Sequence, residues 1–143
     1  MSYKKKITMQ QLDLKIHHIG FVTNSIEKSK EEFLKLGFTA QTDTILDELQ
    51  SVYICFLENK NCLIELVEPM NEQSSVNKTL KKTGVAPYHL CYEVDDIEKA
   101  FEDLTDNGFI PLFRPVPAKA INNRLICYLY KKEIGYFELI NKQ

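Results

Sequence analysis

The sequence lacks three features that would place it in other classes of protein. It has no run of about 18 apolar residues, so no membrane-spanning segment is expected. It has no excess of positive charge, because 18 Lys and Arg are set against 20 Asp and Glu and the net charge is −2; this argues against nucleic-acid binding. It has no C-x-x-C pair among its four cysteines, so we expect free thiols in a reducing compartment rather than a zinc knuckle or a disulfide framework.

The length of 143 residues and an apolar share of 44% are typical of one globular domain with its own core. The first 13 residues contain three consecutive lysines, Lys4 to Lys6, with no apolar stretch after them. This start lacks the pattern of a secretory signal. We therefore expect a flexible N-terminal arm at residues 1–13 and a single cytoplasmic domain at residues 14–143.

The chain repeats itself at an offset of 71 residues. When His18 is aligned with His89, the two stretches run without a gap for 21 residues, and seven of the 21 pairs are identical. The identical pairs are His18/His89, Ile26/Ile97, Glu27/Glu98, Lys28/Lys99, Glu31/Glu102, Gly37/Gly108 and Phe38/Phe109. Further along, I-C-F-L from Ile54 corresponds to I-C-Y-L from Ile126. A fixed internal period indicates a duplicated structural unit.

Each copy has the same order of predicted elements. A strand rich in β-branched and aromatic residues (16–22 and 88–94) precedes an amphipathic helix, and three further strands complete the unit. Candidate N-caps are Asn24 or Ser25 in the first copy and Asp95 or Asp96 in the second. The predicted buried stripes are Ile26, Phe33 and Leu36, and Ile97, Phe101 and Leu104. Gly37 and Gly108 are expected to end the helices.

These elements predict an α+β fold built from two tandem βαβββ modules. The first module covers residues 14–70 and the second covers residues 87–142. Residues 71–86 are predicted to be a polar linker between them. Residues 114–123, which contain Pro115 and Pro117, are predicted to form a loop.

One His and one Glu in each copy have an unusual position. Strand alternation places His18 and His89 on the face opposite to the one that the helices cover. Glu65 and Glu138 each have apolar neighbours in mid-strand, where a carboxylate is unfavourable unless it is paired or bound to a metal. A lone His on a strand is ordinarily structural, but two of the three histidines here are equivalent, and both are matched by a Glu. We predict a divalent-metal site for Zn²⁺, Co²⁺, Ni²⁺, Mn²⁺ or Fe²⁺.

Four motifs in order then resemble the vicinal oxygen chelate superfamily, which includes glyoxalase I and methylmalonyl-CoA epimerase. They are H-H-I-G-F from His17, L-I-E-L-V-E-P from Leu63, Y-H-L-C-Y-E-V-D-D-I from Tyr88 and Y-F-E-L-I from Tyr136. The resemblance implies that the two modules form a cupped, open mixed sheet around an octahedral metal held by four ligands, His18, Glu65, His89 and Glu138. It also implies a homodimer.

The implied chemistry is proton transfer next to a metal-chelated carbonyl or thioester, with an acyl-CoA or a thiol adduct as the small-molecule substrate. The motifs resemble those of methylmalonyl-CoA epimerases more than those of glyoxalases. The base is then expected to be Glu138 or Glu48, the nearest acidic residue before the predicted strand at 51–57. Arg124, Asn122 and Asn123 are candidates for substrate binding near the mouth of the cup.

Three alternatives stay open at this point. The first is a glyoxalase I-type lactoylglutathione lyase. The second is an extradiol dioxygenase, which uses two His and one Glu on iron, so that the extra Glu65 argues against it. The third is a non-catalytic, drug-sequestering member of the superfamily, which would lack the metal ligands. His17 has no equivalent in the second copy, where Tyr88 stands, and is expected to be structural or to support a metal ligand.

Overall fold

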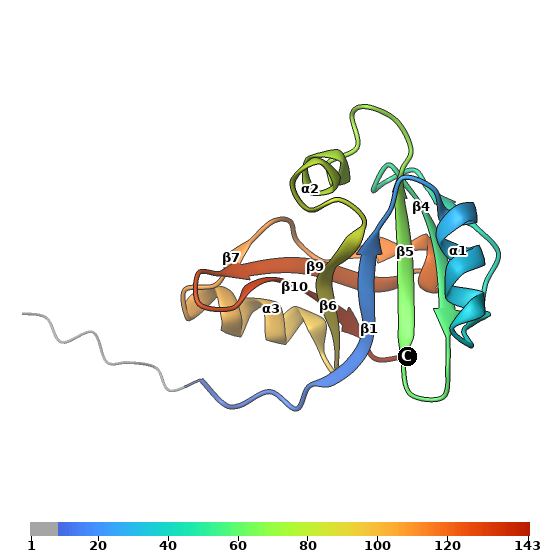
Figure 1. The fold of residues 1–143 in the computed structure, drawn as a ribbon. Coiled ribbons are helices and arrows are strands. Elements are labelled where there is room, and N and C mark those ends of the chain that lie inside the picture. Colours follow the sequence, from blue (N-terminus) through green and yellow to red (C-terminus); the bar gives the residue numbers. More distant parts are fainter. Residues whose placement is uncertain (1–8) are drawn as a thin grey trace, which may run out of the picture.

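The structure is a computed structural model that describes residues 9–143, with three α-helices and ten strands (Figure 1). In chain order the elements are β1 (Lys15–Val22), α1 (Ile26–Lys35), β2 (Thr39–Ala40), β3 (Ile45–Asp47), β4 (Val52–Glu58), β5 (Leu63–Pro69), α2 (Val76–Thr83), β6 (Ala86–Val94), α3 (Ile97–Asp106), β7 (Ile110–Pro111), β8 (Val116–Ala118), the 3-10 helix η1 (Lys119–Ile121), β9 (Arg124–Lys131) and β10 (Gly135–Asn141).

All ten strands form one open mixed sheet with an internal symmetry. The strand order is β2-β4-β5-β1-β6-β10-β9-β7, with β3 paired to β4 and β8 paired to β9. Two parallel pairs, β1 with β5 and β10 with β6, flank the central antiparallel pair of β1 and β6. A pseudo-twofold axis between β1 and β6 therefore relates the two halves. This arrangement confirms the predicted α+β fold with a repeated unit in an open mixed sheet.

The helices α1 and α3 begin and end where the sequence indicates. The Ser25 hydroxyl accepts a hydrogen bond from the Lys28 N–H, and the Asp96 carboxylate accepts one from the Lys99 N–H, each at 3.2 Å. Gly37 follows the end of α1 with φ +93°, a conformation that suits glycine. The predicted burial of Leu36 is wrong, because this residue lies past the last turn of α1 and 73% of its surface is exposed.

Three segments differ from the predictions. The expected linker contains α2, a helix of two turns in which Val76 and Leu80 are the only apolar residues. The expected loop at 114–123 contains β8 and η1, because β8 finds a partner in β9, a contact that local sequence does not reveal. In each half, the first of the three strands predicted after the helix is replaced by two short strands. These are β2 and β3, which both pair with β4, and β7 and β8, which both pair with β9.

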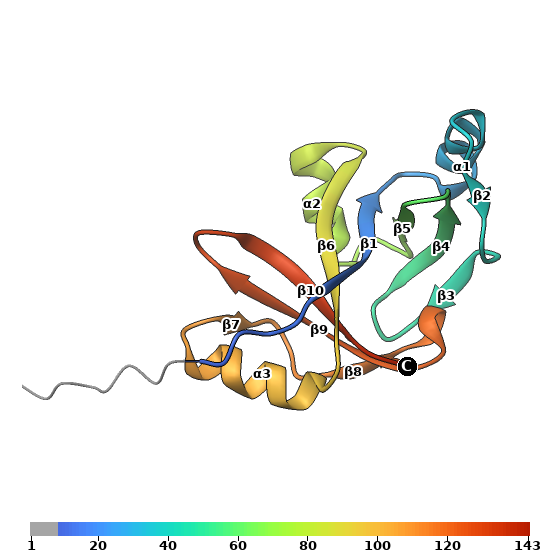
Figure 2. The ribbon, with the colours of Figure 1, turned by 90° about the horizontal axis from the view of Figure 1, so that it is seen from below.

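Alternation along the strands divides the core into an outer and an inner layer. Figure 2 shows α1 beside the strands of the first half and α3 beside those of the second. On the outer face, α1 covers a cluster of apolar side chains from β4 and β5, and α3 covers one from β9 and β10 that also includes Val94 of β6. The inner face has two further clusters, Val52, Ile54, Phe56 and Val67 in the first half and Cys91, Ala118, Ile126 and Ile140 in the second. Ile121 of η1 packs against both inner clusters.

The predicted arm at 1–13 lies largely outside the described residues. At its described end, Met9 and Leu12 are half-buried against the outer cluster of the second half. All four cysteines are free, as expected. Within residues 9–143, none of the helices is long and apolar enough to cross a membrane.

Candidate metal centre

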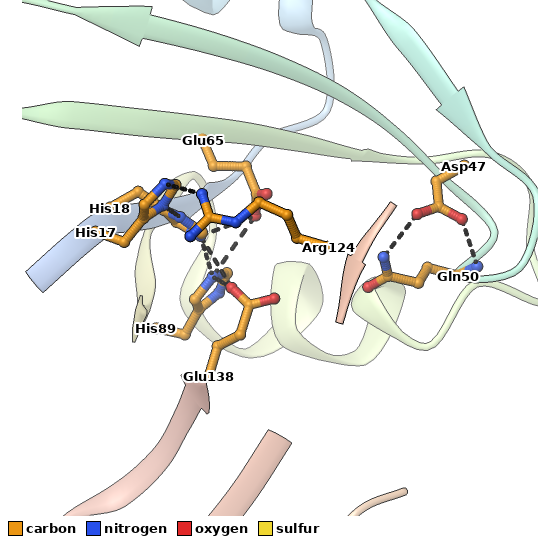
Figure 3. A network of polar contacts seen from close by, with 8 residues as sticks. All are labelled: His17, His18, Asp47, Gln50, Glu65, His89, Arg124 and Glu138. Carbon is orange, nitrogen blue, oxygen red and sulfur yellow. Dashed lines mark hydrogen bonds and ion pairs between the residues drawn. The ribbon is translucent and has the colours of Figure 1, made fainter. Parts of the chain in front are cut away.

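Four titratable side chains converge on the inner face of the sheet, each from a different one of its four central strands (Figure 3). His18 lies on β1, Glu65 on β5, His89 on β6 and Glu138 on β10. Each of the four is at most 5% exposed. The structure therefore brings together the four residues that the sequence singles out, away from bulk solvent and between the two inner apolar clusters.

The ligand atoms of this cluster all face one another. The two imidazole Nε2 atoms are 3.2 Å apart. Glu138 Oε1 lies 2.9 Å from His18 Nε2 and 3.2 Å from His89 Nε2, and Glu65 Oε1 lies 3.6 Å from both nitrogens. Ligands bound at about 2.1 Å and at right angles around one cation are about 3 Å apart. The spacing of the four atoms fits a shared divalent ion.

One buried oxygen of the cluster lacks a hydrogen bond, which also supports a metal site. Glu138 Oε1 has no hydrogen-bond partner in residues 9–143, although two ring nitrogens lie near it, because neither contact has hydrogen-bond geometry. A buried oxygen without a donor is unfavourable. Two imidazoles and two carboxylates are also the donor set that zinc and its first-row neighbours prefer. The residues present therefore fit a divalent metal.

The charges of the cluster are strongly coupled. Burial opposes protonation of His18, but the Glu65 carboxylate and then Glu138 outweigh it and raise the pKa of His18 to about 10. For Glu138, burial opposes the charged form, yet the imidazoles of His18 and His89 hold its pKa well below the usual range. In the absence of a metal, a protonated His18 thus partly neutralises the two buried carboxylates.

A small residue lies opposite each imidazole, a feature that sequence reasoning missed. In the antiparallel pairing of β1 with β6, Gly20 lies opposite His89 and Cys91 lies opposite His18. A Cβ atom on Gly20 would come within 2.0 Å of His89 Cε1. Gly20 and Cys91 are equivalent in the repeat, and this equivalence is the only signal in the sequence that could have identified them.

His17 and Arg124 form a polar network behind His18. His17 Nδ1 is 2.8 Å from His18 Nδ1, and Arg124 Nη1 is 3.4 Å from His17 Nε2. Arg124 also donates to Glu93 at 2.7 Å and to the Asn141 carbonyl at 2.8 Å. Burial, and then the positive charges beside it, lower the pKa of His17 to about 4. The guanidinium that was expected to bind substrate is thus engaged on three sides by the protein itself.

The other predicted site residues lie apart from this cluster. Glu48 is exposed, in the turn that follows β3. Its neighbour Asp47 is the buried carboxylate of this turn, and it accepts hydrogen bonds from the side chain and the backbone of Gln50 at 2.7 and 3.2 Å (Figure 3). Asn122 and Asn123 are exposed after η1, and both adopt positive φ. The structure brings none of these three predicted residues into the His and Glu cluster.

A second group of potential ligands, His17, His18 and Cys91, also has its atoms within 4.8 Å of one another. It shares His18 with the first group, and two of its members offer ring nitrogens that already face each other. Burial, reinforced by Glu138, raises the pKa of the Cys91 thiol well above its ordinary value, which disfavours the thiolate that binds metals. The first group is therefore the better ligand set.

The chain is similar to known proteins in sequence and in fold. Residues 17–128 match the family model of the Glyoxalase/Bleomycin resistance protein/Dioxygenase superfamily. The chain is 26% identical over 125 residues to the mitochondrial methylmalonyl-CoA epimerase of Dictyostelium discoideum, in a match that covers 85% of this chain and 73% of the relative.

Two solved structures have the same fold over nearly the whole chain. A hypothetical protein from Bacillus halodurans C-125 is 27% identical with a TM-score of 0.82, over 92% of this chain and 96% of that one. A variant of the Streptomyces coelicolor methylmalonyl-CoA epimerase, in complex with 2-nitronate-propionyl-CoA, is 25% identical with a TM-score of 0.79, again over 92% and 96% of the two chains.

Proposed function

The chain belongs to the glyoxalase/bleomycin resistance protein/dioxygenase superfamily, and from this premise we propose that it is a divalent-metal-dependent epimerase. The reaction would remove and return a proton at a carbon next to a carbonyl or thioester. The observation that carries the proposal is the buried cluster of His18, Glu65, His89 and Glu138, whose four ligand atoms lie within 4.8 Å of one another.

These four side chains would hold the metal, which could be Zn²⁺, Co²⁺, Ni²⁺, Mn²⁺ or Fe²⁺. When bound, such an ion polarises a carbonyl oxygen and lowers the pKa of the adjacent C–H. The protein contributes a dry surrounding: Phe56 packs edge-on against His18, and Tyr88 and Tyr128 pack edge-on against His89. These rings exclude water and hold both imidazoles in place.

Glu138 is the better supported of the two candidate bases. It is 2% exposed, and its Oε1 faces the centre of the cluster, so a carbon bound there would be within its reach. Glu48 is exposed in the turn after β3 and is not among the clustered ligand residues. We therefore assign proton transfer to Glu138 and keep Glu48 as the alternative that the experiment must separate.

The proposed substrate is a small acyl-CoA of the methylmalonyl type. Two observations support this choice: the similarity to methylmalonyl-CoA epimerases and the similar structure that holds 2-nitronate-propionyl-CoA. The glyoxalase-type alternative uses the same kind of site on a different substrate, a thiol adduct of an α-ketoaldehyde. The drug-sequestering alternative would have no use for four converging metal ligands.

Proton–deuterium exchange in D₂O, followed by NMR on metal-loaded protein with methylmalonyl-CoA, tests the proposal. Exchange at the α-carbon is expected in the wild type and in Glu48→Gln, and about 100-fold or greater loss is expected in Glu138→Gln. Glu72→Gln, a change at an exposed position, is the control. Loss of exchange in Glu48→Gln alone would move the base to the turn after β3. No exchange in metal-loaded wild type would exclude the epimerase, and turnover of methylglyoxal–thiol hemithioacetals would then assign the glyoxalase reaction.

A further inference from the structure

We propose that His17 is a positioning residue that presents His18 to the metal, by accepting a hydrogen bond from the ring nitrogen of His18 that the metal does not use. This inference rests on the metal site in the proposed function. It concerns a residue that has no counterpart in the second half of the chain, where Tyr88 occupies the equivalent position.

The geometry places His17 where such a partner is needed. The two rings are nearly perpendicular, with an interplanar angle of 78° and centroids 5.1 Å apart. Their Nδ1 atoms are 2.8 Å apart, a short separation for a hydrogen bond between two nitrogens. On the other side of its ring, His18 directs Nε2 toward Glu138 and His89. The two nitrogens of His18 therefore have separate surroundings, one for the cluster and one for His17.

The position of the shared proton follows from this geometry. Only one proton can lie between the two Nδ1 atoms. Coordination through His18 Nε2 requires a free electron pair on that atom, so a neutral His18 must carry its proton on Nδ1 and donate it to His17. The acceptor atom of His17 then fixes both the tautomer and the ring orientation of His18.

His17 is itself confined by Arg124. Arg124 is anchored by Glu93 at 2.7 Å and by the Asn141 carbonyl at 2.8 Å, so its guanidinium has little freedom to move. Its Nη1 lies 3.4 Å from His17 Nε2, a long contact for a hydrogen bond, and a neutral His17 that accepts at Nδ1 carries its own proton on Nε2 and so accepts none from Arg124. We assign Arg124 the role of a wall that holds the ring of His17 against His18, rather than that of a donor to it.

The second half of the site provides an internal contrast. His89 Nδ1 is buried and has no hydrogen-bond partner in residues 9–143. Its neighbour Tyr88 contacts the ring only through an edge-to-face packing, with centroids 4.4 Å apart. The two imidazoles therefore differ at Nδ1: this atom of His18 has a hydrogen-bond partner in His17, whereas that side of the His89 ring has only packing contacts.

The test compares Co²⁺ and Zn²⁺ affinities, measured by isothermal titration calorimetry with a competing chelator, in three variants. His17→Phe keeps a ring but removes the acceptor, and it is expected to weaken metal binding by about 10- to 100-fold. His17→Asn places an amide oxygen near the position of Nδ1 and is expected to recover affinity to within about threefold of wild type. Tyr92→Phe, on the outer face of β6 against Phe137, is the control and is expected to leave the affinity unchanged.

A spectroscopic measurement on the wild type does not depend on how the variants fold. In ¹⁵N-labelled, zinc-loaded protein, one ring proton is expected to show scalar coupling to both His17 Nδ1 and His18 Nδ1. Because the chain has only three histidines, the signals can be assigned by single substitutions.

The outcomes separate the two proposals. If the wild type binds no metal, the proposed function fails. If it binds metal but His17→Phe binds equally well, or if the shared proton shows coupling to only one ring, the role of His17 is overturned. If Phe and Asn weaken binding equally, His17 contributes shape rather than a hydrogen bond, which also overturns the inference.

Discussion

Replacing Gly20 with Ala tests whether the small residue opposite His89 is required for the metal site. Gly20 does not have the positive φ that alanine would resist, so the substitution acts through space alone. The new Cβ would lie 2.0 Å from His89 Cε1, against an ordinary contact of at least 3.4 Å, so the ring edge must move by about 1.4 Å (3.4 minus 2.0).

The size of this movement determines the expected result. Tyr88 and Tyr128 pack on the imidazole of His89 and resist its displacement. A metal ligand tolerates only about 0.2 Å of error in its bond length, so Gly20→Ala removes His89 from the ligand set and weakens metal binding by about 100-fold or more. Overpacking is also expected to lower the stability of the metal-free protein by about 1–3 kcal/mol, which corresponds to roughly 3–10 °C in Tm.

Calorimetric metal titration and thermal unfolding measure the two effects. Gly37→Ala is the control, because its φ is +93° and nothing lies within 4 Å of the added Cβ. It should cost about 1 kcal/mol through the backbone and leave metal affinity unchanged. In a His89→Ala background, Gly20→Ala should cost less than about 0.5 kcal/mol, because the clash is gone. Metal affinity retained within about threefold in Gly20→Ala would refute the steric argument.

Three further predictions concern metal and pH. Removing the metal with a chelator should lower the Tm, because binding stabilises the fold by about 2.7 kcal/mol at a free-metal concentration 100-fold above Kd; an unchanged Tm in scanning calorimetry would contradict the site. The pKa of His18 in metal-free protein is raised from 6.5 to about 10, so its stabilisation is complete below the lower value and is lost as the pH rises through the higher one. In urea unfolding of the metal-free proteins, the free energy of unfolding of wild type should decline in this way with rising pH, and that of His18→Gln should not. If the two proteins gave parallel curves of stability against pH, the role of His18 would be refuted. A hydrogen bond from Arg124 lowers the pKa of Glu93, so this carboxylate stabilises the fold above its ordinary value of 4.5 and ceases to do so as the pH falls through the lowered pKa. Glu93→Gln should therefore be less stable than wild type at pH 7 and should converge with it in acid, and a difference that persists at low pH would show that the ion pair is not the cause.

The four clustered residues could be predicted from the sequence because two independent patterns fix them. Strand alternation determines which face His18 and His89 occupy, and the repeat matches each with a Glu at nearly the same distance along the chain, 47 and 49 residues away. Both constraints are local or periodic. Neither depends on knowing how the two halves pack.

The features that the sequence did not reveal depend on contacts between distant segments. Arg124 is 107 residues from His17 and 31 residues from Glu93, so its role in the network depends on the register of separate strands. Gly20 has a function only because β1 and β6 pair with His89 opposite it. The helix α2 was missed for a different reason: it has only eight residues, and two apolar positions four residues apart, Val76 and Leu80, are too few to distinguish a helix from a polar linker.

The strand order has a consequence for the two halves of the chain. Each half contributes one imidazole and one carboxylate to the cluster and pairs its first strand with that of the other half, so two identical copies around a twofold axis would form the same set of four ligands. A half-length chain would therefore assemble the complete ligand set as a pair. In a single chain the two equivalent positions are free to differ, and the difference between His17 and Tyr88 gives the two imidazoles surroundings that a pair of identical copies would not have.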